Sequence, residues 1–451
     1  MNIALSFGAL CFLLALGKFL RVKVKAFHSL HLPASVIAGL LGLSIVQCAG
    51  PDISSHFTAG WSKLPGLLIN IVFAALFLGV TVPPLREIWR KSGPQLAYGQ
   101  VVAWGQYVVG LGLVLMCLGP LFGVSHLFGV IVPVGFEGGH GTAGGLGPTF
   151  TELGWAEGTD YALASATAGI ISAIVVGMAL VNWASQKGVL TQVKGPGEMS
   201  RDELVGLYPV ENRPIAGKQT VAADSVDALA LHLAIIGIAI LVGLGIKTGL
   251  ARAESFIPAL RDVGVMRRFP LFPLCMIGGL LVQLTVTRFA RISPIDHGLM
   301  QRLGGTALDF LVVAAISTIR VEVIGEGFVP FVVIVAGGIV WNVFCVVWLA
   351  KRMLPDFWFE RAIAEMGQSM GVTATGLLLL RVVDPESKTS APSAFGYKQL
   401  LHEPFMGGGL WTSMAVLFVW RLGAWPVLGI SIGAITAWLV VWWFVLRKPG
   451  H

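Results

Sequence analysis

Two stretches of this 451-residue chain place ionisable and hydroxyl side chains within apolar, glycine-rich sequence. The first stretch, residues 135–148, contains Glu137, His140 and Thr142. Ionisable groups in an apolar membrane setting are energetically expensive, and they usually have a function there. Carboxylate and hydroxyl oxygens, together with carbonyl groups freed from helical hydrogen bonds, are suitable ligands for a sodium ion.

The second stretch, residues 365–376, repeats this combination with Glu365, Thr373 and Thr375. The two glutamates are candidate ion ligands, and the threonines of both stretches are candidate ligands for a solute. Each glutamate could instead carry protons or bond to a helix end as a structural acid. His140 could bond the solute or hold the backbone around it.

Glycine recurs within both stretches, and each glycine costs a helix roughly 1 kcal/mol relative to alanine. We therefore expect two re-entrant hairpins, 124–150 and 357–383, each made of a helix, an unwound tip and a second helix. Such backbone is tolerated at membrane depth only when protein or a water-filled cavity surrounds it. The alternative is an ordinary pair of helices that pack closely through small residues.

Three polar residues outside the glycine-rich tips are further candidates. Asn70 and Asp309 lie within apolar helices, where Asp309, together with its repeat partner Asn70, could bind an ion or the pair could form polar contacts between helices. Arg381 ends the second hairpin and could reach a substrate carboxylate, or face lipid phosphates as a loop arginine.

The elements that position these residues are membrane helices. Of all residues 55% are hydrophobic and only 12% are charged, too few charges to cover a soluble core. Apolar runs of about twenty residues recur, each long enough to cross the bilayer as a helix. We expect about eleven such helices, at 2–20, 32–49, 64–82, 97–121, 160–184, 227–249, 269–287, 303–319, 327–350, 402–420 and 425–446.

The two halves of the chain share landmarks in the same order. The matching pairs are Pro33 with Pro270, Asn70 with Asp309, Trp104 with Trp341, and Glu137 with Glu365. Five crossings separate equivalent points, and an odd number inverts the second copy. The expected units are an N-terminal repeat, 1–184, with five helices and the first hairpin, a cytoplasmic connector, 185–226, and a C-terminal inverted repeat, 227–451, that ends in an additional helix, 425–446. Inverted repeats with broken helices indicate a substrate site near the bilayer midplane.

Basic residues predict the orientation, because lysine and arginine concentrate in cytoplasmic loops. With the N-terminus outside and the C-terminus inside, most basic loops lie on the inner side; these basic residues are Arg21, Lys23, Lys25, Arg86, Arg90, Lys91, Arg288, Arg291, Arg302, Lys351, Arg352, Arg447 and Lys448. The loop 250–268, with four arginines, is the exception. The net charge of +7 therefore does not indicate a nucleic-acid partner.

The residues Gly138-Gly139-His140-Gly141-Thr142 match a signature in the first hairpin of bacterial sodium/glutamate symporters. The run from Gly371 to Thr375 resembles the glycine-x-threonine-proline-threonine of their second hairpin, with Ala374 in place of proline. Length, central loop and inverted halves match as well, so the resemblance covers nearly the whole chain.

This resemblance implies sodium-coupled uptake of glutamate or a related acidic amino acid or dicarboxylate across the bacterial inner membrane. It further implies an elevator-type movement against a dimeric scaffold, no organic cofactor, and substrate contacts from Gly139, His140, Gly141 and Thr142. Glu137 and Glu365 stand where the family pattern has neutral residues. Two acids beside an anion site need sodium, a proton or an arginine to compensate them.

Two other function classes compete with symport. A sodium/proton exchanger would use Glu137, Glu365 and Asp309 without an organic solute. A membrane-embedded enzyme would need a nucleophile with a base or a metal triad, and no second histidine or cysteine has ligand spacing to His140. We therefore expect a transporter, not an enzyme, and no metal beyond sodium.

Overall fold

A computed structural model describes residues 3–29, 32–49, 58, 60–80, 85–190, 207–208, 210–213, 215–222, 224–256, 269–384 and 388–447. Its regular elements over these residues are all helices. Eight of them are long and apolar enough to cross a membrane: 4–23, 92–122, 158–186, 228–256, 272–289, 297–317, 328–353 and 424–446. The expectation of an all-helical, polytopic membrane protein is therefore confirmed, whereas eleven full-length spans are not.

Three of the expected spans are shorter helices. The expected helices 32–49, 64–82 and 402–420 correspond to α3 (Ala34–Cys48), α5 (Leu64–Ala75) and α24 (Leu410–Leu422). After α5 the chain turns at Gly79, whose φ of +76° favours glycine. Before α24, residues 403–409 are not helical because they include Pro404 and three consecutive glycines.

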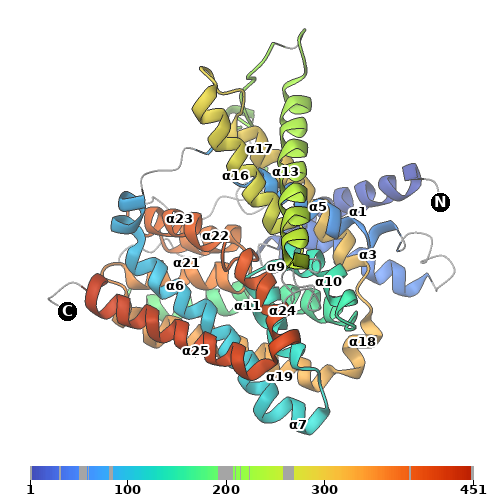
Figure 1. Cartoon of the computed structure of the whole chain (residues 1–451). Coiled ribbons are helices and arrows are strands. Elements are labelled where there is room, and N and C mark those ends of the chain that lie inside the picture. The colour runs from blue at the N-terminus through green and yellow to red at the C-terminus, as the bar shows by residue number, and fades with distance from the viewer. Residues whose placement is uncertain are drawn as a thin grey trace.

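One group of helices comes from the beginning of each half of the chain. Its members are α1 (Ile3–Lys23), α3, α5, α13 (Ala228–Phe256), α16 (Phe272–Phe289) and α17 (His297–Ser317). In Figure 1, α13, α16 and α17 project away from the rest of the molecule. Helix α1 packs on α3 as α13 packs on α16, and α17 packs on both α3 and α5.

A second group comes from the later part of each half. It contains α6 (Leu85–Leu113), α7 (Gly119–Phe122), α8 (Ile131–Phe136), α9 (Gly139–Gly145), α10 (Gly147–Glu152), α11 (Gly158–Gln186), α18 (Val321–Glu326), α19 (Phe328–Phe344), α20 (Ala350–Met353), α21 (Trp358–Ser369), α22 (Thr373–Val383), α23 (Ala391–His402), α24 and α25 (Ala424–Val441). Helix α6 runs alongside α25 and also contacts α19 and α23 (Figure 1).

The long helices α6 and α19 share an unusual feature. Each continues into a π-helical turn, Val114–Leu118 after α6 and Cys345–Leu349 after α19. A broken segment follows each of them, and π turns of this kind are often found near functional sites. The two helices contact each other, since the indole N–H of Trp341 in α19 donates to the carbonyl of Val102 in α6 at 2.8 Å.

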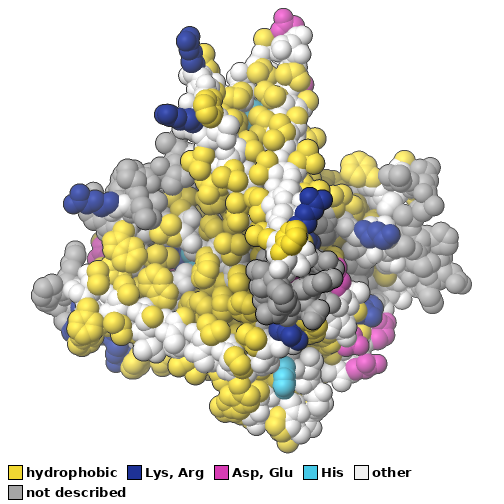
Figure 2. All heavy atoms as spheres, in the orientation of Figure 1, with side chains coloured by type: hydrophobic (Ala, Val, Ile, Leu, Met, Phe, Trp, Pro, Cys, Tyr) yellow, Lys and Arg dark blue, Asp and Glu magenta, His cyan; other side chains and the backbone are white. Residues whose placement is uncertain are grey.

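Apolar side chains cover much of the outer surface. Figure 2 shows them over the projecting helices, where Leu233 and Leu241 of α13 and Leu284 and Phe289 of α16 are exposed. A helix that exposes leucines along its length fits a lipid environment, because lipid chains solvate these side chains as a protein core would. Of the expected connector 185–226, residues 191–206 lie outside the described residues, as does most of the basic loop 250–268.

Candidate functional site at the two chain breaks

The first glycine-rich stretch is broken, as the sequence predicts. Helix α8 ends at Phe136, Glu137 and Gly138 follow, and α9 begins at Gly139. Gly139 has a φ of +64°, a left-handed conformation that strains residues with a Cβ atom. The glycine at this position therefore allows the chain to turn directly after the Glu137 carboxylate.

The second stretch breaks between α21 and α22. Val372 is extended, with φ −147° and ψ 164°, and α22 begins at the next residue. The two helices pack against each other at glycines, because a Cβ on Gly367 would lie 2.7 Å from the Cα of Gly376. Close approach of two backbones requires small residues at such positions.

The two breaks meet, although they are more than 200 residues apart in sequence. A Cβ placed on Gly139 would lie 3.3 Å from Cγ1 of Val372 and 3.5 Å from the carbonyl oxygen of Gly371. The polar residues beside both breaks are therefore collected into one buried cluster.

Glu137 has one satisfied and one unsatisfied oxygen. Its Oε2 accepts hydrogen bonds from Gln368 Nε2 at 2.9 Å and from His402 Nε2 at 3.1 Å. Its Oε1 is buried and has no hydrogen-bond partner among the described residues. A buried carboxylate oxygen without a donor is costly, so this atom is suited to a cation.

Glu365 has a different environment. Its Oε1 is 2.5 Å from Nζ of Lys398, and both side chains are completely buried. Its Oε2 accepts a hydrogen bond from Gln95 Nε2 of α6 at 2.8 Å. The positive charge that compensates Glu365 is therefore that of Lys398. The sequence had suggested sodium, a proton or an arginine for this role.

Lys398 also connects the two halves of the cluster. Its ammonium donates to Gln368 Oε1 at 3.0 Å and to Gln399 Oε1 at 2.9 Å. Because an ammonium is donor-only, these contacts orient both side-chain amides. Gln368 then presents its Nε2 to Glu137, and so links the lysine to the acid of the other half.

The hydrogen bonds also determine the tautomer of His402. The Trp104 indole N–H donates to Gln100 Oε1 at 3.0 Å, which leaves Gln100 Nε2 facing His402 Nδ1 at 3.3 Å. An amide nitrogen can only donate, so Nδ1 accepts. The histidine proton is then on Nε2, and the neutral ring donates to Glu137.

The predicted threonines have unequal surroundings. Thr373 donates to Glu403 Oε2 at 3.0 Å and accepts from Gln399 Nε2 at 2.6 Å. Thr142 is buried, and its Oγ1 has no hydrogen-bond partner among the described residues. Thr375 is buried on the first turn of α22, one turn beyond the break.

Other predicted residues are not part of the cluster. His140 Nε2 bonds to Thr167 Oγ1 of α11 at 2.9 Å, so this side chain connects α9 to α11. A Cβ on Gly141 would face Ile69 and Leu308, which are apolar neighbours. Arg381 is exposed at the end of α22 that is far from the break.

Asn70 and Asp309 lie on the packed pair α5 and α17. The Asn70 amide donates to the carbonyl of Gly66 in its own helix at 2.9 Å, and Cys275 Sγ is 3.8 Å from its Oδ1. Asp309 is exposed on α17 beside Ser35 of α3. Neither contact includes a residue of the cluster.

Sequence reasoning missed the contribution of α23. Lys398 and His402 are four positions apart, at i and i+4, and therefore share a helix face, with Gln399 beside them. They follow a polar stretch that is too short and too mixed to be recognised as a membrane span. The available signal was the pair of ionisable residues at i and i+4 directly before an apolar run.

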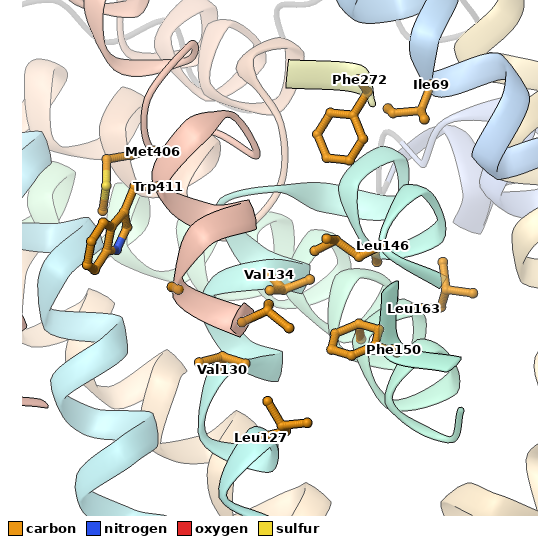
Figure 3. Packing of buried hydrophobic residues seen from close by; sticks show 14 of the residues in the cluster. Ile69, Leu127, Val130, Val134, Leu146, Phe150, Leu163, Phe272, Met406 and Trp411 are labelled. Carbon is orange, nitrogen blue, oxygen red and sulfur yellow. The ribbon is translucent and has the colours of Figure 1, made fainter. Parts of the chain in front are cut away.

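Buried apolar residues enclose the first break. Figure 3 shows Met406 and Trp411 on one side of this segment, and Ile69 and Phe272 on the other. Val134 lies between them, directly before the break. This packing excludes lipid from the broken backbone, as polar backbone at membrane depth requires.

Broken segments that converge on buried polar groups in a polytopic helical protein are typical of secondary transporters. The chain matches the sodium/glutamate symporter family over residues 1–384 and is a member of that family. Membership implies sodium-coupled glutamate transport by a transporter, not catalysis by an enzyme. Among curated proteins, no match to the sequence is found. The family match ends before α23, so Lys398, Gln399, His402 and Glu403 lie beyond it.

Proposed function

We propose that the chain transports glutamate, or a related acidic amino acid or dicarboxylate, together with sodium at the junction of the two breaks. The observation that carries this proposal is the contact of Gly139 with Gly371 and Val372, which gathers polar groups from both halves. In inverted-repeat transporters, broken helices at equivalent positions commonly form the substrate and ion sites.

Sodium is proposed to bind Glu137 Oε1 and Thr142 Oγ1. Support comes from the state of these two oxygens, which are buried without hydrogen-bond partners among the described residues. They flank the Gly138–Gly139 turn, where backbone carbonyls are also close. The second acid, Glu365, is less suited to this role because Lys398 already neutralises it.

The substrate carboxylate is proposed to bind the N-terminus of α22. No side chain among the described residues caps this eleven-residue helix, so the backbone N–H groups of Thr373 and Ala374 can bind an anion. Thr373 and Thr375 lie in its first turn; Thr375 would add a hydroxyl donor, whereas the Thr373 hydroxyl already donates to Glu403. Arg381 is less suited to this role, because it is exposed at the opposite end.

We further propose two inverted repeats, 1–184 and 227–451, with re-entrant hairpins at 124–150 and 357–383. Paired contacts support this, since α1 on α3 corresponds to α13 on α16, and α3 on α17 to α16 on α5. The two helix groups then correspond to the scaffold and the moving domain of an elevator. The inner-membrane location, the orientation with the N-terminus outside, and the homodimer are proposed from the family and the basic loops.

The experiment that tests the function is uptake into proteoliposomes. Labelled glutamate, aspartate and dicarboxylates are offered with and without an inward sodium gradient. We expect sodium-stimulated uptake of at least one acid. The Glu137, Glu365 and Lys398 cluster also suits sodium/proton exchange, which predicts sodium-dependent proton flux without any organic solute. Such flux without uptake of any acid would refute symport.

Glu137→Gln and Thr142→Val test the proposed sodium site. Each substitution removes one oxygen ligand or its charge, so we expect sodium-coupled uptake to fall by at least about tenfold, equivalent to about 1.4 kcal/mol of binding. Glu152→Gln, an exposed acid at the end of α10, is the matched control and should transport normally. Size-exclusion profiles establish that the variants are folded. Unchanged uptake in both variants would rule out this site.

A further inference from the structure

A completely buried ammonium lies beside the second broken segment. Lys398 Nζ is held by three oxygens, at 2.5 Å from Glu365, 3.0 Å from Gln368 and 2.9 Å from Gln399. The side chains of Lys398 and Glu365 have no exposed surface, and Gln368 is 2% exposed. An ammonium has three N–H donors, and each has one oxygen partner here.

This saturation excludes one role for the lysine in the described state. A lysine that binds a substrate carboxylate needs a donor directed at the substrate, and all three donors of Lys398 are used inside the protein. Its charge is directed instead to Glu365, while the amide Oε1 atoms of Gln368 and Gln399 complete the shell. One carboxylate and two amide oxygens around a single positive charge are the ligand types that also coordinate sodium.

We propose that Lys398 is a tethered cation, which permanently occupies a sodium-type site formed by Glu365, Gln368 and Gln399. The chain itself thus neutralises the acid of the second break, while the acid of the first break is left for a mobile ion. The two halves have equivalent glutamates, yet only one of them remains available to a coupling ion.

The inference rests on the proposed sodium-coupled function, but its test needs no transport. Thermal unfolding of the full-length purified protein is measured in sodium chloride and in choline chloride at equal ionic strength, without organic substrate. A ligand that binds the folded state raises the unfolding temperature as its concentration increases. The unfolding measurement can therefore be interpreted even if the protein shows no glutamate uptake.

The decisive variants are Lys398→Ala and Lys398→Met. Both remove the charge, but alanine leaves room for an ion beside Glu365, whereas methionine fills most of that space. We expect sodium to stabilise Lys398→Ala more strongly than it stabilises the wild type, by a further shift of several degrees. Lys398→Met should show no such gain.

Two controls separate the site from general charge effects. Glu365→Gln combined with Lys398→Ala removes both charges, so the additional sodium response should disappear. Lys187→Met alters an exposed lysine at the end of α11 and should behave as the wild type. In uptake assays, the Hill coefficient for sodium should rise in Lys398→Ala, by at most one, since one more ion would bind.

The inference is overturned if Lys398→Ala responds to sodium no more than the wild type, or no more than Lys398→Met. It is also overturned if Lys398→Ala yields no folded protein in sodium, because a sodium ion is expected to replace the ammonium. Recovery of folded Lys398→Ala in sodium but not in choline would support it.

Discussion

His402 illustrates how a neutral side chain can orient a charged one. Its ring bridges Gln100 of α6 and Glu137 after α8, and the Trp104 indole determines which ring nitrogen accepts. The ring therefore donates to Glu137 Oε2, while Oε1 has no hydrogen-bond partner among the described residues. Hydrogen bonds that orient a ligand group in this way tune its affinity for an ion.

Substitution of His402 tests this orientation. In His402→Leu the donor to Glu137 is lost, and we expect the sodium concentration for half-maximal uptake to rise about tenfold, because a charge-assisted hydrogen bond contributes about 1.5–3 kcal/mol. His402→Gln keeps an N–H donor and should retain most of the affinity. Equal sodium affinity in both variants would contradict the proposed role of the ring.

At this scale the sequence predicts the acids but not their partners. Glu137 and Glu365 are conspicuous because carboxylates are rare among apolar residues. His402, more than 250 residues after Glu137, reaches it only through the packing of α23 against α6 and α21. Contacts of that separation leave no local pattern, so the pairing cannot be derived from spacing.

The helix α9 packs through a glycine face. A Cβ on Gly144 would lie 2.8 Å from Cβ of Pro65, and one on Gly145 would lie 3.0 Å from Ile69. The glycines of this segment therefore have both of the roles that the sequence suggested. Gly139 interrupts the helix, whereas Gly144 and Gly145 allow close packing on α5. Smooth surfaces of this kind suit elements that slide past each other.

Gly144→Val tests whether this contact is needed for transport. The added side chain overlaps Pro65, and overpacking of this kind typically costs about 1–3 kcal/mol. We expect folded protein with a much lower maximal uptake rate, measured in proteoliposomes. Gly147→Ala on the same segment makes only an ordinary contact with Thr159, at 3.4 Å, and should transport normally.

The start of α17 offers a test of local stability. Asp296 caps this helix by accepting the backbone N–H of Leu299 at 3.0 Å, and it also accepts that of Lys218 at 3.1 Å. Asp296→Ala should lower the free energy of unfolding by about 1 kcal/mol. Thermal unfolding checks the loss, and Asp296→Asn, which keeps an acceptor, should lose less.

The same cap predicts a pH dependence. Slight burial raises the pKa of Asp296, but hydrogen bonds from the backbone N–H groups of Leu299, Lys218 and Gly298 outweigh it and hold the pKa below its ordinary value. A lowered folded-state pKa stabilises the protein above the ordinary carboxyl range. The difference between wild type and Asp296→Ala should therefore shrink as the pH falls through that lowered pKa.

The helices and their interruptions were predictable where the local sequence is strongly apolar or rich in glycine. Long apolar runs indicate the eight long helices, and clustered glycines indicate the two breaks. Helix ends were less predictable, because α5 stops at Ala75 within a run that remains apolar. Helix α23 was missed, since it follows a polar stretch that resembles a loop.

At the scale of the whole molecule, the two helix groups meet where α9 contacts α5 and α17. A cysteine pair across this contact tests relative movement. Ile69→Cys with Gly145→Cys, in a protein whose five native cysteines are replaced, places two thiols on neighbouring positions. Oxidation should stop uptake and a reductant should restore it. Undiminished uptake by the fully cross-linked protein would contradict an elevator movement.

The pairing of Glu365 with Lys398 predicts how the two positions vary together among homologous sequences. Loss of Glu365 alone leaves an uncompensated ammonium in the interior, which typically destabilises a protein by about 3–5 kcal/mol, whereas joint replacement is tolerated far better. Lineages that diverged from this chain should therefore not keep the lysine without the acid, whereas loss of the lysine alone would require a sodium ion in its place. A homologue with a neutral residue at the position of Glu365 should lack the lysine too.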